Sequence, residues 1–135
     1  MLDIIWDQTY SVNIAEIDRQ HQKFTAMLDM LFEAIEAGRS QGALSEILRE
    51  LVAYAEYHFD TEEKLMIQHH YPEFGAHHKE HEKFRAKIAE FYKGFREGKE
   101  TITGDVAKFM TYWIADHVMK TDKKYASFSN ACGVF

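Results

Sequence analysis

The sequence has 135 residues, a formal net charge of −6, a single cysteine and eight histidines. This length predicts one domain, residues 1–135, without an intrachain disulfide, and the acidic charge argues against a nucleic-acid-binding surface. Because no apolar run approaches the roughly 20 residues of a membrane span and the N-terminus lacks signal-peptide features, we expect a cytoplasmic protein without membrane insertion.

The N-terminal residues 1–16 are too apolar for a free tail, so we expect them to pack across the molecule as an extended arm. A helical pattern follows at about 18–37, with Asp18 as its expected N-cap. Apolar residues alternate there at spacings of three and four, which is typical of a helix with one buried stripe. His21 fills the one gap in that series.

Three further stretches, at about 43–70, 73–96 and 104–121, show the same spacing, and glycine or proline marks the breaks between them. The stretches have ligand-type residues on their inner stripes: His58 and Glu62, then His77 and His81, then His117. Short connections make neighbouring helices antiparallel. The pattern therefore predicts an all-α protein, an up-down-up-down antiparallel four-helix bundle with an extended N-terminal arm.

The spacing within these groups decides which side chains can share a helix face. His58 with Glu62, and His77 with His81, are i,i+4 pairs, so each pair lies one above the other on one face. His117 and Asp122 are five residues apart, or about 140° around a regular α-helix. We therefore expect either a helix end or a π-type widening between them.

Buried imidazoles and carboxylates are costly unless something compensates them, and a metal centre can do so. The candidate ligands are His21, His58, Glu62, His77, His81, His117 and Asp122. A core histidine bonded to backbone would explain one such residue, but not five together. Seven ligands are too many for one ion and suit two ions with bridging carboxylates and an open position. A mixed nitrogen and oxygen set favours iron over the alternatives manganese, cobalt and zinc. His78 also lies within reach of His81, but the stripe spacing favours His77.

Taken together and in order, these motifs resemble the hemerythrin family. The match consists of Trp6 in the arm, Ile17-Asp18-Arg19-Gln20-His21, HxxxE at 58–62, Tyr71-Pro72 before HxxxH at 77–81, and HxxxxD at 117–122. Each motif alone is weak, whereas the ordered set on four amphipathic helices is specific.

The resemblance implies two iron ions (Fe2+/Fe3+) bridged by an oxo or hydroxo group, Glu62 and Asp122. It further implies a coordinatively saturated iron held by three histidines, namely His77, His81 and His117. His21 and His58 would hold the second iron, which keeps an open position for O2. The apolar walls of the O2 pocket would be Phe24, Phe59, Trp113 and Ile114. The family often has leucine where this chain has Ile114.

The function expected from the resemblance is reversible O2 binding for transport, storage or delivery, by a monomer that is not an enzyme. A di-iron enzyme or scavenger acting on peroxide or NO is an alternative, as is a sensor of O2 or redox state working with a partner in trans. Ferritin-like di-iron enzymes use Glu-x-x-His pairs, and this sequence contains none, which favours binding. The expected partner is O2, and an O2-consuming oxidase or oxygenase is a candidate recipient.

Overall fold

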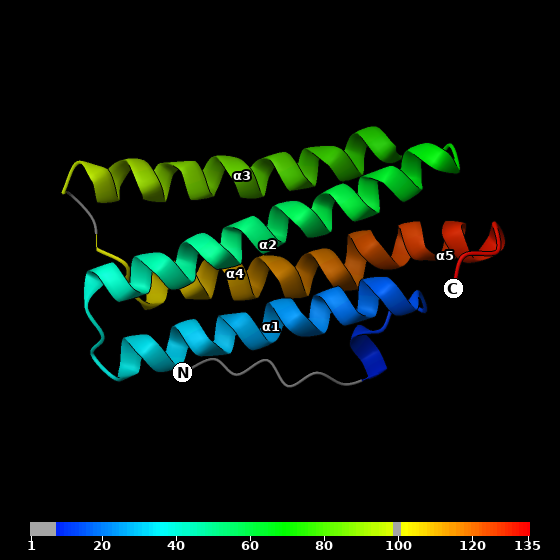
Figure 1. Ribbon diagram of the computed structural model, residues 1–135. Coiled ribbons are helices and arrows are strands. Elements are labelled where there is room, and N and C mark those ends of the chain that lie inside the picture. Colours follow the sequence, from blue (N-terminus) through cyan, green and yellow to red (C-terminus); the bar gives the residue numbers. More distant parts are fainter. Residues whose placement is uncertain (1–7, 99–100) are drawn as a thin grey trace.

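The computed structural model describes residues 8–98 and 101–135 and shows helices lying side by side along one common direction (Figure 1). Its elements are the 3-10 turn η1 (Gln8–Tyr10), α1 (Ala15–Glu36), α2 (Gln41–Gln68), α3 (Phe74–Arg96), α4 (Gly104–Asp116), the π-helical turn η2 (His117–Asp122) and α5 (Lys123–Ala131). Because α4, η2 and α5 form one continuous rod, the described residues make a four-helix bundle without strands, as the sequence predicts.

The segment before α1 packs on the bundle where it is described. The expected arm falls partly on residues 1–7, including Trp6, which lie outside the described residues. Val12 and Ile14, which are described, are 3 and 2% exposed. This apolar segment therefore contributes to the core.

The start of α1 differs from the expected one, because the helix begins at Ala15 and Asp18 lies in its first turn. Asp18 Oδ1 accepts a hydrogen bond from the Val12 amide at 2.8 Å, and its Oδ2 accepts one from Ser11 Oγ at 2.6 Å. The carboxylate thus anchors the preceding segment instead of capping the helix. An acidic residue in a first turn is still favourable to the helix dipole.

Two local features set the break between α1 and α2. Gly38 adopts a φ of 68°, the left-handed conformation that glycine reaches without steric cost, and it follows the end of α1. Ser40 then caps α2, its hydroxyl accepting from the Ala43 amide at 3.2 Å. The chain reverses here, so the start of α1 lies beside the end of α2 (Figure 1).

The last helical rod is longer than the sequence indicates. The expected helix ended at residue 121, but the rod continues through η2 and α5 to Ala131. It continues because the residues after the π turn still have a buried face, with Tyr125, Ala126 and Ser129 at most 3% exposed. The widening expected between His117 and Asp122 is present as η2.

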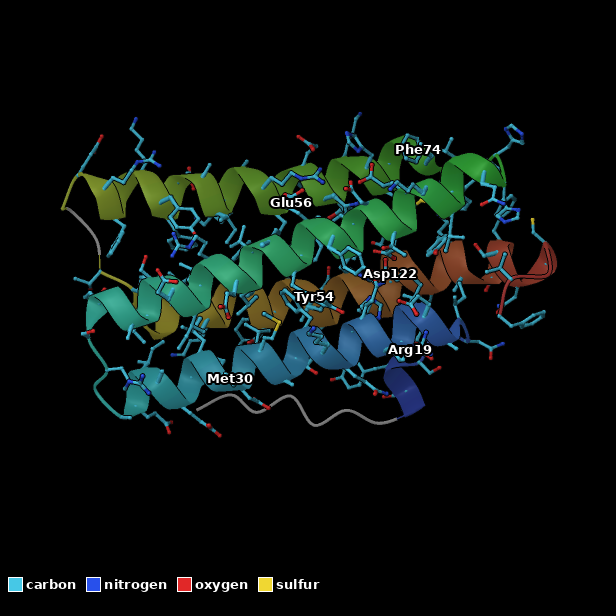
Figure 2. All side chains as sticks on the ribbon, in the orientation of Figure 1. Arg19, Met30, Tyr54, Glu56, Phe74 and Asp122 are labelled. Carbon is cyan, nitrogen blue, oxygen red and sulfur yellow. The ribbon has the colours of Figure 1, made fainter. Side chains whose placement is uncertain are left out.

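The buried side chains are apolar in one part of the bundle and polar in another. Leucines of α1 and α2, among them Leu28, Leu31, Leu48 and Leu51, are at most 2% exposed and fill the part nearer the α1–α2 connection. Polar residues occupy the interior nearer Asp122 (Figure 2). Among the described residues, no helix is long and apolar enough to cross a membrane.

Candidate metal centre

Every helical rod contributes a polar side chain to one buried cluster. The seven candidate ligands are at most 2% exposed: His21 from α1, His58 and Glu62 from α2, His77 and His81 from α3, and His117 and Asp122 from η2. The structure thus brings all seven together, although they span about a hundred residues of sequence. Figure 2 shows Asp122 among the rods and away from their ends.

The cluster resolves into two sets of donor atoms that could each hold an ion. The three-histidine group contains His77, His81 and His117 with Glu62. The two-histidine group contains His21 and His58 with Glu62 and Asp122. Within each group the donor atoms lie within 4.8 Å of one another, so the cluster offers two adjacent four-donor sites that share a carboxylate.

Glu62 lies between the two groups. Its Oε1 is 3.0 Å from Nε2 of His58 and 3.5 Å from Nε2 of His81, which belong to different groups. Its Oε2 is 3.9 Å from Nε2 of His77. A carboxylate in this place can bridge two ions.

Asp122, on the last rod, also lies between the two groups, and the π turn explains why its side chain points inward. A regular helix would rotate it well away from His117, whereas the wider turn keeps both side chains inside. Asp122 Oδ1 is 2.9 Å from Nε2 of His117, and its Oδ2 is 3.1 Å from Nε2 of His21. This second carboxylate therefore also contacts histidines of both groups.

The choice between His77 and His78 follows from helix phase. His77 is 1% exposed and its Nε2 lies 3.1 Å from Oδ1 of Asp122. The side chain of His78 is 42% exposed and its Nδ1 bonds to Glu63 on the outer face. The structure therefore directs His77 into the cluster and His78 away from it.

Several buried atoms of the cluster lack a partner with hydrogen-bonding geometry. They include both carboxylate oxygens of Glu62, Nε2 of His58 and Nε2 of His77. Nε2 of His81 and Nε2 of His117 face each other at 3.2 Å. Buried polar atoms are normally satisfied, so convergent lone pairs of this kind fit a bound metal pair in both number and donor type.

Burial and mutual repulsion govern the charges in the metal-free cluster. Burial, reinforced by the neighbouring Asp122 carboxylate, raises the pKa of Glu62 to about 8. Burial also disfavours the Asp122 anion, but His117, His21 and His77 outweigh it and hold the pKa of Asp122 well below its ordinary value. Burial lowers the pKa of His58 to about 4. At neutral pH and without metal, Glu62 is thus protonated and Asp122 is ionised.

Two aromatic side chains, Phe59 and Trp113, pack against histidine rings of the cluster. The residues expected as pocket walls are Phe24, Phe59, Trp113 and Ile114, of which all but the half-buried Trp113 are at most 3% exposed. Phe59 stacks on His81 with ring centroids 4.0 Å apart and lies 6.1 Å from His58. Trp113 stacks on His117 at 4.4 Å. Phe59 thus contacts both groups, whereas Trp113 covers the three-histidine group.

Two outer partners of the histidines were not anticipated from the sequence. Gln20 is 2% exposed and its Oε1 lies 2.7 Å from Nδ1 of His58. Glu63 Oε2 lies 3.0 Å from Nδ1 of His81. Helical phase could have indicated Gln20, which shares the inner face with Ile17, but nothing in the sequence separates Glu63 from an ordinary surface glutamate.

Tyr125 was also missed, because the last helix was expected to end before it. The side chain is fully buried, and its ring meets that of His77 edge-on at 5.5 Å. Burial raises the pKa of this phenol. A polar group of this kind beside the cluster belongs to the same buried site.

Comparisons with known proteins agree on one family. Residues 12–128 match the model of the Hemerythrin HHE cation binding domain. The chain is 32% identical to Bacteriohemerythrin of Stenotrophomonas maltophilia, over 91% of this chain and 79% of the relative. It is 31% identical to Myohemerythrin of Theromyzon tessulatum, over 89 and 88%. A crystal structure of wild-type hemerythrin superposes with a TM-score of 0.86 at 28% identity, covering 92% of this chain and 95% of that one. The chain belongs to the hemerythrin family.

Proposed function

We propose that this protein binds O2 reversibly at a non-haem di-iron centre. The observation that carries the proposal is the pair of adjacent four-donor groups, which share Glu62 and have Asp122 between them. Relatives named bacteriohemerythrin and myohemerythrin support the same assignment. The proposed ligands are His21, His58, Glu62, His77, His81, His117 and Asp122.

The two groups divide the proposed ligands unequally. We assign three imidazoles to one iron and two to the other, with Glu62 and Asp122 bridging the pair. Since the second iron then has one imidazole fewer, it keeps the coordination position at which a small molecule can bind. When bound, two ferrous ions would supply the electrons that an O2 molecule takes up and returns.

The protein contributes geometry and an environment that excludes water. Neutral imidazoles and two carboxylates leave little net charge on an iron pair, which an apolar interior can tolerate. Phe24 and Ile114 are buried three residues along the chain from His21 and His117, and side chains without polar atoms disfavour bulk water. These features suit reversible binding better than chemistry that must deliver protons and release product.

Anaerobic reconstitution with ferrous iron tests the proposal. We expect two irons per chain and a visible absorption band that appears when O2 is added and disappears when O2 is removed. The variant His69→Ala, at the C-cap of α2 and outside both donor groups, should behave in the same way. Irreversible oxidation, or turnover of added peroxide or NO, would instead indicate a di-iron enzyme, and fewer than two irons per chain would contradict the ligand assignment.

A further inference from the structure

The outer nitrogens of two cluster histidines have partners of different charge. Nδ1 of His81, in the three-histidine group, lies 3.0 Å from a carboxylate oxygen of Glu63. Nδ1 of His58, in the two-histidine group, lies 2.7 Å from the amide oxygen of Gln20. The hydrogen bonds are alike in position, but only one of them brings a negative charge to its imidazole.

The direction of both hydrogen bonds follows from the partners. An ionised carboxylate can only accept, so His81 donates from Nδ1 to Glu63. Gln20 Nε2 donates to Glu16 Oε1 at 3.0 Å and lies 3.4 Å from Thr61 Oγ1, which leaves its amide oxygen facing His58. Both imidazoles therefore carry their proton on Nδ1 and direct the Nε2 lone pair into the cluster.

Glu63 is held in place by more than His81. Its side chain is 13% exposed, and its Oε1 accepts from Nδ1 of His78. The guanidinium of Arg85 lies 3.9 Å from Oε2, and Glu56 anchors that guanidinium through contacts of 2.8 and 3.0 Å. The carboxylate is thus fixed on its outer side, with one oxygen directed at the ring of His81.

We infer that Glu63 is a positioning residue that fixes the tautomer of His81 and favours the ferric state at the three-histidine group, whereas Gln20 fixes His58 without adding charge. This inference rests on the proposed di-iron function. A carboxylate behind a ligating imidazole makes that imidazole a stronger donor, which stabilises the more highly charged ion. A neutral amide supplies orientation with much less of this effect.

The consequence is an electronic asymmetry between the two irons. Glu62 and Asp122 would serve both irons alike, whereas of the two outer partners only Glu63 is a carboxylate, and it lies behind an imidazole of the three-histidine group. When the iron pair loses one electron to a chemical oxidant such as ferricyanide, the ferric ion should reside in this group. The two-histidine group then keeps the ferrous ion.

Exchanging the two outer partners separates charge from geometry. Glu63→Gln keeps an oxygen acceptor for His81 and removes the charge, and Gln20→Glu places a carboxylate behind His58. The matched control is Asp60→Asn, which removes a negative charge from an exposed position of α2 outside both donor groups.

The first measurement is a redox titration of the iron-loaded variants, followed in the visible spectrum and by Mössbauer spectroscopy with iron-57. We expect Glu63→Gln to reduce the preference of the three-histidine group for ferric over ferrous ion about tenfold. That factor equals an upward shift of about 59 mV in its one-electron potential. Gln20→Glu should lower the potential of the other iron. The redox role is overturned if Glu63→Gln shifts the potential no further than Asp60→Asn does.

The second measurement needs no metal. Nitrogen-15 NMR of the histidine rings in the metal-free protein should show the proton of His81 on Nδ1 in the native chain and in Glu63→Gln, and a loss of this preference in Glu63→Ala. A proton on Nε2 of His81 in the native chain overturns the positioning role whatever the iron content. If the tautomer is as expected but fewer than two irons bind, the proposed di-iron function is contradicted. The redox role of Glu63, which depends on that function, is then contradicted as well.

Discussion

Glu62 places a carboxylate where its charge is unfavourable, at 0% exposure and close to a second carboxylate. Metal ions would reverse that balance, because their positive charge favours the ionised form of every ligand. Metal uptake should therefore release protons. The metal-free protein, by contrast, should depend on pH in a way set by Glu62 and His58.

We expect the metal-free protein to lose stability as pH rises from about 6.5 to 8. The pKa of Glu62 is raised from 4.5 to about 8, so above pH 4.5 the folded state holds a proton that the unfolded chain has released. Stability then falls by up to about 1.4 kcal/mol per pH unit, or about 2 kcal/mol over this window. Urea denaturation at a series of pH values measures the slope, and Glu62→Gln should flatten it. Stability that rises over this window would contradict the expectation.

At lower pH, His58 makes the stability of the folded state rise with pH, which is opposite to the effect of Glu62. Its pKa is lowered from 6.5 to about 4, so its contribution to folding is complete above pH 6.5 and is lost as pH falls toward 4. Between about pH 4.5 and 6.5 the two groups oppose each other. Replacing His58 with glutamine should remove the acid-side loss, as the same urea series would show.

Removing one histidine should cost metal and stability together. In His117→Ala, Asp122 loses the imidazole 2.9 Å away and remains buried with its charge. Breaking a buried pair of this kind costs about 3–5 kcal/mol. Iron per chain, measured after reconstitution, should fall below two, and calorimetry should show a lower Tm. The control is His69→Ala, at the C-cap of α2 and outside both donor groups, which should keep two irons per chain. Normal iron content in His117→Ala would exclude its ligand role.

At the scale of elements, the π turn is one of the two outcomes that the spacing of His117 and Asp122 predicts, the other being a helix end. Two inward side chains that are five positions apart do not fit a regular helix, so a widening or a helix end at His117–Asp122 could be anticipated. The continuation into α5 could not, because lysines around Asp122 resemble a helix end. Tyr125 was missed for that reason.

Hydrogen bonds between side chains of different helices could not be predicted from the sequence. The periodicity indicates which face of α1 carries His21 and which face of α2 carries His58. It cannot show that Gln20, on α1, supports His58 on α2, because that contact depends on how the two helices are aligned. The same holds for Glu63 and His81. Helix phase is encoded locally, whereas the pairing of side chains between helices is set by packing.

The cap of α2 gives a prediction confined to one element. Ser40 accepts from the Ala43 amide, and Ser40→Ala should remove this bond and cost about 1 kcal/mol of unfolding free energy. Ser40→Asp keeps a capping oxygen and should cost much less. Because Ser40 lies at the α1–α2 connection, far along the bundle from Asp122, iron content should stay the same (Figures 1 and 2). Equal losses in both variants, measured by urea denaturation, would exclude a capping role.

At the scale of the whole molecule, the apolar part of the core and the polar cluster contribute differently to folding stability. The leucine-rich part can hold the helices together without metal, since it buries large side chains from α1 and α2. The cluster part opposes folding when it is empty, because its donors are desolvated. Metal should therefore change stability far more than it changes helix content.

We expect a chelator to lower the Tm of the iron-loaded protein while leaving most of its helical circular dichroism at 20 °C. Free metal at a thousand times its Kd would stabilise the folded state by about 4 kcal/mol per site. Calorimetry of loaded and chelated samples measures the difference, and re-addition of ferrous iron should restore it. A Tm unaffected by the chelator would contradict coupling between the cluster and folding.

The placement of the proposed ligands on every rod also has a topological consequence. His21 lies near the beginning of the sequence and Asp122 near its end, and the remaining donors are distributed between them. A filled centre would therefore act as a cross-link that closes several long loops at once. No rod could then detach alone without releasing a ligand. Loss of iron from such a protein should be slow and should be limited by the opening of the chain around it.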